Sequence, residues 1–266
     1  QSTQVEMHAG IVDNFFTGVS PDPYTATAAA NFVLEQGVKN VVLFTSDEGG
    51  SWSARTPLWF GDVIEAGGGK VLSKLNYSFG TSDWAPQIAE IKALGEPVDA
   101  VYISSIMPDV GVLVRQLRGA GIDAWVVGAD GFDDPSLDAI GSDDAALLDK
   151  VVFATLAPSH ADSAVTEFRA ACDAIGIDVP GLFPATGADT VKAVAWAVEK
   201  SGSTDPEAIA DAIRNADSIP VLTVDSISFK ETRTFAQRNI PVVGFQDGKR
   251  VLLSSKIPAN VPGDWN

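Results

Sequence analysis

The apolar positions along the chain follow two alternating patterns. Short apolar runs without alternation, such as residues 41–44, are typical of strands buried on both faces of a parallel sheet. Between such runs lie segments with apolar positions three and four apart, as in 83–94, which predict amphipathic helices. The alternation predicts right-handed βαβ units, and therefore an α/β fold built on a parallel, doubly wound sheet.

The pattern places the expected elements of the first part of the chain. Strands are expected at 41–44, 70–75, 98–103, 125–127 and 150–155. Helices are expected between them, at 24–34, 52–66, 83–94 and 108–120. The Gly- and Asp-rich segment 128–135 is expected to form a loop.

The second part of the chain changes character. Helices are expected at 162–175, 186–200 and 205–216. They are followed by expected strands at 221–229, 240–245 and 251–253. The Asp247-Gly248 step lies between the last two strands and predicts a tight hairpin turn.

Composition removes several classes of function. With 35 acidic against 18 basic residues, the formal net charge of −17 argues against nucleic-acid binding, which needs clustered Lys and Arg. Hydrophobic residues at 45% and charged residues at 20% indicate a globular chain. No apolar run reaches the length of a membrane-spanning helix, so none is expected. The single cysteine excludes an internal disulfide.

Three loops follow strands at the edge of the predicted sheet where open α/β sheets bind ligands. They carry Trp52, Ile106 with Met107, and Asp130. An indole offers an apolar face with one N–H donor, and a carboxylate pairs with a ligand ammonium. Each residue also has a structural interpretation that stays open: Trp52 as packing, Met107 as core filling, and Asp130 as a turn former.

Signals for catalysis and metal binding are weak. Residues 49–53 superficially resemble a nucleophile elbow, but the last position is Ser rather than Gly. Asp130, Asp133 and Asp134 lack the spacing of a calcium-binding EF-hand loop. We therefore expect no enzyme activity, no metal and no cofactor.

The order of several short motifs resembles a known family. The motifs are the strand and loop 41–47, then 99–102, 114–121, 128–135, 202–209 and 245–249. Together they resemble the solute-binding proteins of ABC importers, specifically the branched-chain (Leu/Ile/Val) amino-acid-binding family with the type I periplasmic binding fold. The resemblance covers nearly the whole chain.

The resemblance implies a set of ligand-binding positions. In this sequence they are Gln1, Thr3, Asp22, Trp52, Ile106, Asp130 and Phe183. It implies that Gln1 and Thr3 contact the ligand near its carboxylate and that Asp130 pairs with the ligand ammonium. Ile106 stands where some relatives have Tyr, and Gln1 stands where they have a small residue. These departures leave the ligand open, although Trp52 and Ile106 suit an apolar side chain.

The resemblance also implies two discontinuous lobes joined by three hinge crossings. Lobe two comprises 22–157 and 238–266, and lobe one comprises 1–21 and 158–237. A complete lobe of this fold needs about six parallel strands, so part of lobe one, about 100 residues, is expected to be missing from this chain.

The expected function is capture of a small amino acid, amide or carboxylate by hinge closure and its delivery to the permease subunits of an ABC transporter. The protein is expected to be monomeric and periplasmic or otherwise extracytoplasmic, with a lipid anchor outside this chain left open. Two alternatives remain. One is a ligand-sensing receptor or regulatory domain of the same fold, and the other is a small-molecule hydrolase.

Overall fold

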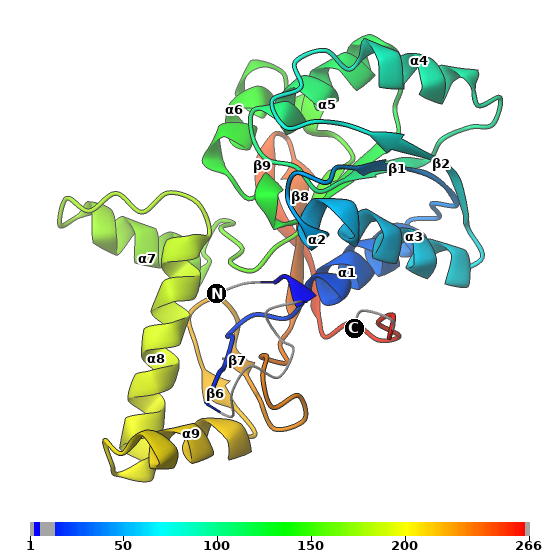
Figure 1. Ribbon diagram of the computed structural model, residues 1–266. Helices are drawn as coiled ribbons and strands as arrows, with labels where there is room; N and C mark the ends of the chain where they lie inside the picture. Colours follow the sequence, from blue (N-terminus) through cyan, green and yellow to red (C-terminus); the bar gives the residue numbers. More distant parts are fainter. Residues whose placement is uncertain (1–2, 6–13, 264–266) are drawn as a thin grey trace.

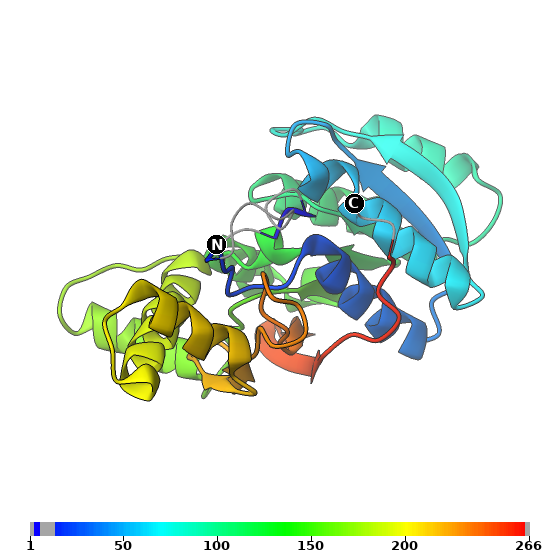
Figure 2. The ribbon, with the colours of Figure 1, turned by 60° about the horizontal axis from the view of Figure 1, so that its bottom comes forward.

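The protein has two lobes that the chain links by three crossings (Figures 1 and 2). The structure is a computed structural model that describes residues 3–5 and 14–263. The larger lobe, called the sheet lobe, holds a seven-stranded sheet with helices on both faces. The smaller lobe, called the small lobe, lies to one side of it in both views.

The sheet is mostly parallel. Its strands are β1 (Asn40–Thr45), β2 (Lys70–Asn76), β3 (Ala100–Ile103), β4 (Trp125–Gly128), β5 (Val151–Ala154), β8 (Ile240–Gln246) and β9 (Lys249–Lys256). They follow the order β2-β1-β3-β4-β5-β8-β9. Strands β1 to β5 pair in parallel as predicted, whereas β8 and β9 are added antiparallel. The parallel order brings the carboxyl ends of β1, β3 and β4 to one edge.

Helices cover both faces of this sheet (Figure 1). One face carries α1 (Asp22–Glu35) and α3 (Thr56–Ala66), and the other carries α4 (Ala85–Ala93), α5 (Asp109–Gly119) and α6 (Pro135–Asp143). Successive residues of β1 point to opposite faces. Val41 and Leu43 join the core with α1 and α3, and Val42 and Phe44 join the core with α4 and α5. Both faces are buried, which explains why the strand is apolar at every inner position.

Some elements differ from the sequence prediction. The helix expected at 52–66 is divided at Arg55 into α2 (Ser51–Ala54) and α3. The expected loop at 128–135 contains a short 3₁₀ helix, η2 (Asp130–Phe132), and leads into α6, which the sequence interpretation did not assign. Its signal was the Asp-Pro step, because Asp134 accepts a hydrogen bond from the Ser136 N–H (2.8 Å) and so caps α6. A second 3₁₀ helix, η3 (Ala145–Leu148), leads to β5.

The small lobe consists mainly of helices. It contains α7 (Ala164–Asp173), α8 (Phe183–Ser201), α9 (Pro206–Asn215) and the short strands β6 (Ile219–Pro220) and β7 (Ser226–Ile227). The prediction of a strand over 221–229 is wrong for most of its length, because only β7 is a strand there. The backbone N–H groups of Leu222 and Thr223 donate to the carboxylate of Asp189 on α8 (2.7 and 3.0 Å) instead of to a neighbouring strand.

The small lobe lacks a parallel sheet among its described residues. Its α8 exposes Val191 and Val194, at 70% and 44% of their full area. Beside α8, an apolar groove of about 340 Å³ is bordered by residues that include Phe16 and Phe229. Such a face is what a type I lobe without its sheet would leave uncovered, in agreement with the expectation that part of lobe one is missing from this chain.

The first crossing between the lobes lies near residues 17–22, the second near 155–158 and the third near 236–241, and the three lie side by side. The Ala236 N–H donates to the Thr17 carbonyl (2.8 Å), and the Ser20 hydroxyl donates to the Ala236 carbonyl (2.8 Å). The Thr155 N–H donates to the Pro241 carbonyl (2.9 Å). These bonds join segments that are far apart in the sequence into one hinge between the two lobes.

At the far edge of the sheet, β8 and β9 form the predicted hairpin. Asp247 and Gly248 both have positive φ, at 50° and 72°, which a two-residue turn of this type requires. The hairpin matters for the site because β9 carries Arg250, which contacts the Asp130 loop.

Candidate functional site

The candidate site is a cavity of about 300 Å³ between the two lobes. From the sheet lobe it receives the loops that follow β1, β3 and β4. From the small lobe it receives the first turn of α8, and the hinge crossings lie between. It is lined by Thr3, Gln4, Val19, Trp52, Ile106, Asp130, Gly131, Leu156, Leu182, Phe183 and Thr186.

Five of the predicted site residues lie on this one cavity: Thr3, Trp52, Ile106, Asp130 and Phe183. The parallel register accounts for three of them, because loops that leave parallel strands at the same edge come together. Ile106 and Phe183 expose 47% and 65% of their area. They therefore present apolar surface that remains accessible in this structure.

Trp52 and Asp130 form one polar unit on the sheet-lobe wall. The Trp52 indole N–H donates to Asp130 Oδ1 (2.8 Å), and the ring packs edge-on against Phe79 (centroids 6.3 Å apart). A Cβ atom at Gly131 would lie 2.8 Å from the Trp52 ring, so Gly131 lets the ring approach the loop. Trp52 therefore packs, as its structural interpretation expected, and also orients the Asp130 carboxylate, while its contact with a ligand stays a prediction.

Asp130 is the charged side chain among the described lining residues. Burial raises the pKa of its carboxyl to about 6, against the lowering effect of hydrogen bonds from Trp52 and from the Asp130 and Gly131 backbone, and nearby Asp133 raises it further. The carboxylate is costly to keep ionised in this environment without a cationic partner. A ligand ammonium would supply that partner.

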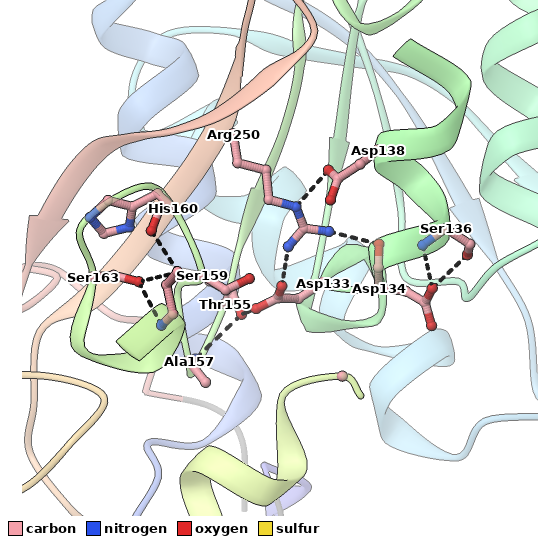
Figure 3. Close-up of polar contacts among 12 residues, drawn as sticks. Asp133, Asp134, Ser136, Asp138, Thr155, Ala157, Ser159, His160, Ser163 and Arg250 are labelled. Carbon is pink, nitrogen blue, oxygen red and sulfur yellow. Dashed lines mark hydrogen bonds and ion pairs between the residues drawn. The ribbon is translucent and has the colours of Figure 1, made fainter. Parts of the chain in front are cut away.

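A buried ion pair holds the Asp130 loop in place (Figure 3). Asp133, two residues beyond Gly131, accepts hydrogen bonds from the Thr155 hydroxyl (2.5 Å) and from Arg250 of β9. Arg250 also donates to Asp138 Oδ1 (2.7 Å) and to the Asp134 carbonyl (2.7 Å). The loop is therefore fixed to both the hinge and the hairpin, which limits how far Asp130 can move.

The hinge and small-lobe walls are mostly apolar. Val19 and Leu156 come from two crossings, and Leu182 with Phe183 come from the start of α8. Thr186, one turn further along α8, adds a hydroxyl that donates to the Phe183 carbonyl (3.1 Å). These walls suit an apolar group opposite the Asp130 carboxylate.

Two predicted site residues are not placed on the cavity. Asp22 is buried (1% exposed) at the start of α1 and does not line it; its backbone N–H donates to the Thr3 carbonyl (2.7 Å), which holds Thr3 near the wall. Gln1 lies outside the described residues. Of the loop after β3, Ser104 is fully buried and Met107 packs against the core, as its structural interpretation expected.

Sequence reasoning missed six residues of the lining: Gln4, Val19, Gly131, Leu156, Leu182 and Thr186. Gly131 adjoins Asp130, and Thr186 lies one helical turn after Phe183, so helical spacing was an available signal for it. Val19 and Leu156 carried no local signal, because only the meeting of the crossings places them on the wall.

Within residues 3–5 and 14–263, no group of three or more His, Cys, Asp or Glu side chains is arranged to hold a metal ion. No helix in the described part of the chain is both long and apolar enough to span a membrane.

Two lobes, three crossings and a cavity between the lobes are the arrangement of a type I periplasmic binding fold. The chain belongs to the periplasmic binding protein family, whose model matches residues 12–249. This confirms the resemblance and the fold class that the sequence predicted.

Individual relatives agree with this assignment. Over 235 residues, 86% of this chain, it is 27% identical to a Leu/Ile/Val-binding protein of Rhizobium johnstonii, and it spans 61% of that relative's length. The leucine-binding protein LivK of Thermotoga maritima has a similar fold (TM-score 0.72, 24% identity, covering 90% of this chain and 67% of that one). So does an ABC-transporter solute-binding protein of R. palustris in complex with benzoate (TM-score 0.77, 18% identity, covering 98% and 70%).

Proposed function

We propose that the protein is the extracytoplasmic solute-binding component of an ABC importer, which captures a small amino acid or a related compound by hinge closure. The observation that supports this most strongly is the Trp52–Asp130 pair on one wall of a cavity between two lobes. The chain would be the larger part of a protein whose lobe one is completed by about 100 further residues. Lobe two, which corresponds to the sheet lobe, would comprise 22–157 and 238–266. Lobe one, which corresponds to the small lobe, would comprise 1–21 and 158–237 together with the further residues.

The cavity favours a ligand with an ammonium group and an apolar side chain. Asp130 would pair with the ammonium, and Ile106, Leu156 and Phe183 would contact the side chain. Thr3 would accept or donate hydrogen bonds near the ligand carboxylate. The Rhizobium relative is named for leucine, isoleucine and valine, whereas the R. palustris protein holds benzoate, so an aromatic carboxylate is the competing ligand class.

The test is calorimetry on the complete protein with L-leucine, with 4-methylpentanoate as the matched compound without the amine, and with benzoate. Leucine is expected to bind and 4-methylpentanoate to bind at least tenfold more weakly. Leaving a buried charge without its partner costs about 3–5 kcal/mol, and the partial exposure of Asp130 reduces that figure. Asp130→Asn should therefore weaken leucine binding at least tenfold.

Asp47→Asn is the matched control, because it removes an exposed carboxylate from the adjoining loop after β1. It should leave leucine affinity unchanged. If only compounds without an amine bind, the role given to Asp130 is wrong and the carboxylate class replaces the amino acids.

The partners follow from the same proposal. The loaded protein would dock on the permease subunits of its transporter and would act as a monomer outside the cytoplasm, in keeping with the family to which the chain belongs. Analytical ultracentrifugation of the complete protein tests whether it is monomeric. Ligand-dependent stimulation of a reconstituted permease tests delivery, and its absence would favour a sensing role for the same fold.

A further inference from the structure

One buried arginine contacts all three crossings of the hinge. Arg238 belongs to the third crossing and is 1% exposed. Its Nη1 donates to the carbonyl of Gly18 in the first crossing (3.0 Å), and its Nη2 donates to the carbonyl of Leu156 in the second (2.7 Å). A single planar guanidinium therefore joins segments that lie 220 and 82 residues away in the sequence.

The remaining contacts of Arg238 belong to the small lobe. Nη2 also donates to the Thr223 hydroxyl (2.6 Å), and Nη1 lies 3.6 Å from Asp189 Oδ2 on α8. Asp189 is itself held by the backbone N–H groups of Leu222 and Thr223. Burial lowers the pKa of Arg238 to about 10, opposed by Asp189, so the guanidinium stays charged at neutral pH. Arg238 thus fastens the crossings to the small lobe.

The contacts of Arg238 lie directly behind the cavity wall. The Gly18 carbonyl precedes Val19, which lines the cavity, and Leu156 is itself a lining residue. Asp189 lies one helical turn after Thr186, another lining residue. Arg238 is absent from the described lining, so any effect on a ligand passes through these residues.

The same contacts continue into the sheet lobe. Thr155 is covalently adjacent to Leu156, and its hydroxyl donates to Asp133 (2.5 Å) of the Asp130 loop. Two hydrogen bonds, joined by the Thr155–Leu156 peptide bond, therefore connect that loop with Arg238. Both walls of the cavity meet at this point of the hinge.

We propose that Arg238 is a positioning residue for the ligand cavity. It holds the three crossings together as one unit, and this unit moves with the small lobe. When the lobes close, each crossing therefore bends between the sheet lobe and the residue that Arg238 contacts or supplies, namely Gly18, Leu156 and Arg238 itself. It also keeps Val19 and Leu156 in the wall opposite Asp130. The effect on ligand affinity rests on the proposed binding function, whereas the effect on lobe orientation does not.

The test variant is Arg238→Lys. It keeps a positive charge beside Asp189, but one ammonium cannot reproduce the fork that reaches Gly18, Leu156 and Thr223 together. Arg118→Lys is the matched control, because the Arg118 guanidinium of α5 likewise donates three hydrogen bonds, in its case all to backbone carbonyls. These belong to Ile122, Ala124 and Asp149, at the amino edge of the sheet, away from the cavity (3.0, 2.9 and 2.7 Å).

Two quantities are measured on the complete protein. The first is L-leucine affinity by calorimetry. The second is the distance distribution between labels on two exposed positions, Lys92→Cys of α4 and Lys200→Cys of α8, in a Cys172→Ala background without ligand. Arg238→Lys should weaken leucine binding at least tenfold and broaden the distance distribution. Arg118→Lys should leave both unchanged even where its melting temperature falls.

The outcomes separate this inference from the proposed function. If wild type binds no leucine, the proposed ligand is wrong, but the distance distribution still tests Arg238. If Arg238→Lys keeps both the affinity and the distribution of wild type, the positioning role is refuted. Should Arg238→Lys fail to fold, Asp189→Asn replaces it, because the amide oxygen still accepts from Leu222 and Thr223 while the ionic anchor of Arg238 is lost. The same broadening is then expected.

Discussion

Acidification should weaken ligand binding through one carboxyl, that of Asp130. Burial holds its pKa at about 6, so the group titrates in a range where surface carboxylates are already ionised. A free amino acid remains zwitterionic between pH 5 and pH 8. Over this range the ligand charge is constant, and the change in affinity reports the protein.

The size of the effect follows from the pKa. The ionised fraction of Asp130 is about 99% at pH 8 and about 9% at pH 5. If the ammonium binds only the carboxylate, Kd for L-leucine should rise about tenfold from pH 8 to pH 5. Binding should then release close to one proton at pH 5 and almost none at pH 8, because the ammonium lowers the pKa of Asp130.

The effect on folding has the opposite sign. A carboxyl whose pKa is raised in the folded state binds its proton more tightly there than in the unfolded chain. Asp130 therefore makes the free protein more stable as pH falls from about 6 towards 4. Weaker binding at pH 5 is thus not a consequence of unfolding at this group, and melting temperatures at each pH verify it.

The assay is isothermal titration calorimetry at pH 5, 6, 7 and 8, repeated in buffers of different ionisation enthalpy to count released protons. Asp130→Asn should show weak binding with no pH dependence, and Asp47→Asn should follow wild type. A wild-type Kd that is constant over this range, or the same pH dependence in Asp130→Asn, would refute the role of Asp130.

Three further changes test the surroundings of the site and the fold. Gly131→Ala places a methyl group well inside the van der Waals distance of the Ser105 carbonyl and should weaken binding and cost about 1–3 kcal/mol of stability in a urea titration. In the same titration Gly119→Ala, with open space around it, should be neutral or slightly stabilising. Arg250→Met leaves Asp133 buried without its cation and should lower the free energy of unfolding by about 3–5 kcal/mol in a urea titration; an unchanged unfolding free energy would contradict the role given to this ion pair. Asp205→Ala removes the N-cap of α9 and should cost about 1 kcal/mol by thermal unfolding with leucine affinity unchanged, whereas a binding defect would contradict the separation of α9 from the site.

The sequence predicts the sheet lobe well because its signals are local. The strand at 41–44 is apolar on both faces, and the Asp247-Gly248 turn has the residues its backbone requires. The error at 221–229 has a different origin. There the apolar and β-branched residues favour a strand, but two backbone N–H groups are taken by the carboxylate of Asp189. A side chain 33 residues away overrides local preference, and no periodicity reports it.

Among the site residues, too, those with a local signal in the sequence are predictable and the others are not. Trp52, Ile106 and Asp130 are predictable because each follows a parallel strand, and the topology brings such loops together. Phe183 was predicted only through the resemblance, and the crossing residues Val19 and Leu156 were not predicted at all. Their positions depend on contacts between distant segments, which a pattern of apolar positions does not encode.

The buried arginines explain why these unpredicted contacts matter. Arg250 fixes Asp133, and through it the Asp130 loop, while Arg238 fixes the crossings that carry the opposite wall. Thr155 and Leu156 are neighbours in the chain, so the two arginine clusters meet across one peptide bond. Buried ion pairs add little net stability, but breaking either leaves charges without partners. Under the proposed hinge closure, these pairs would hold the Asp130 loop and the crossings in defined positions while the lobes move relative to one another.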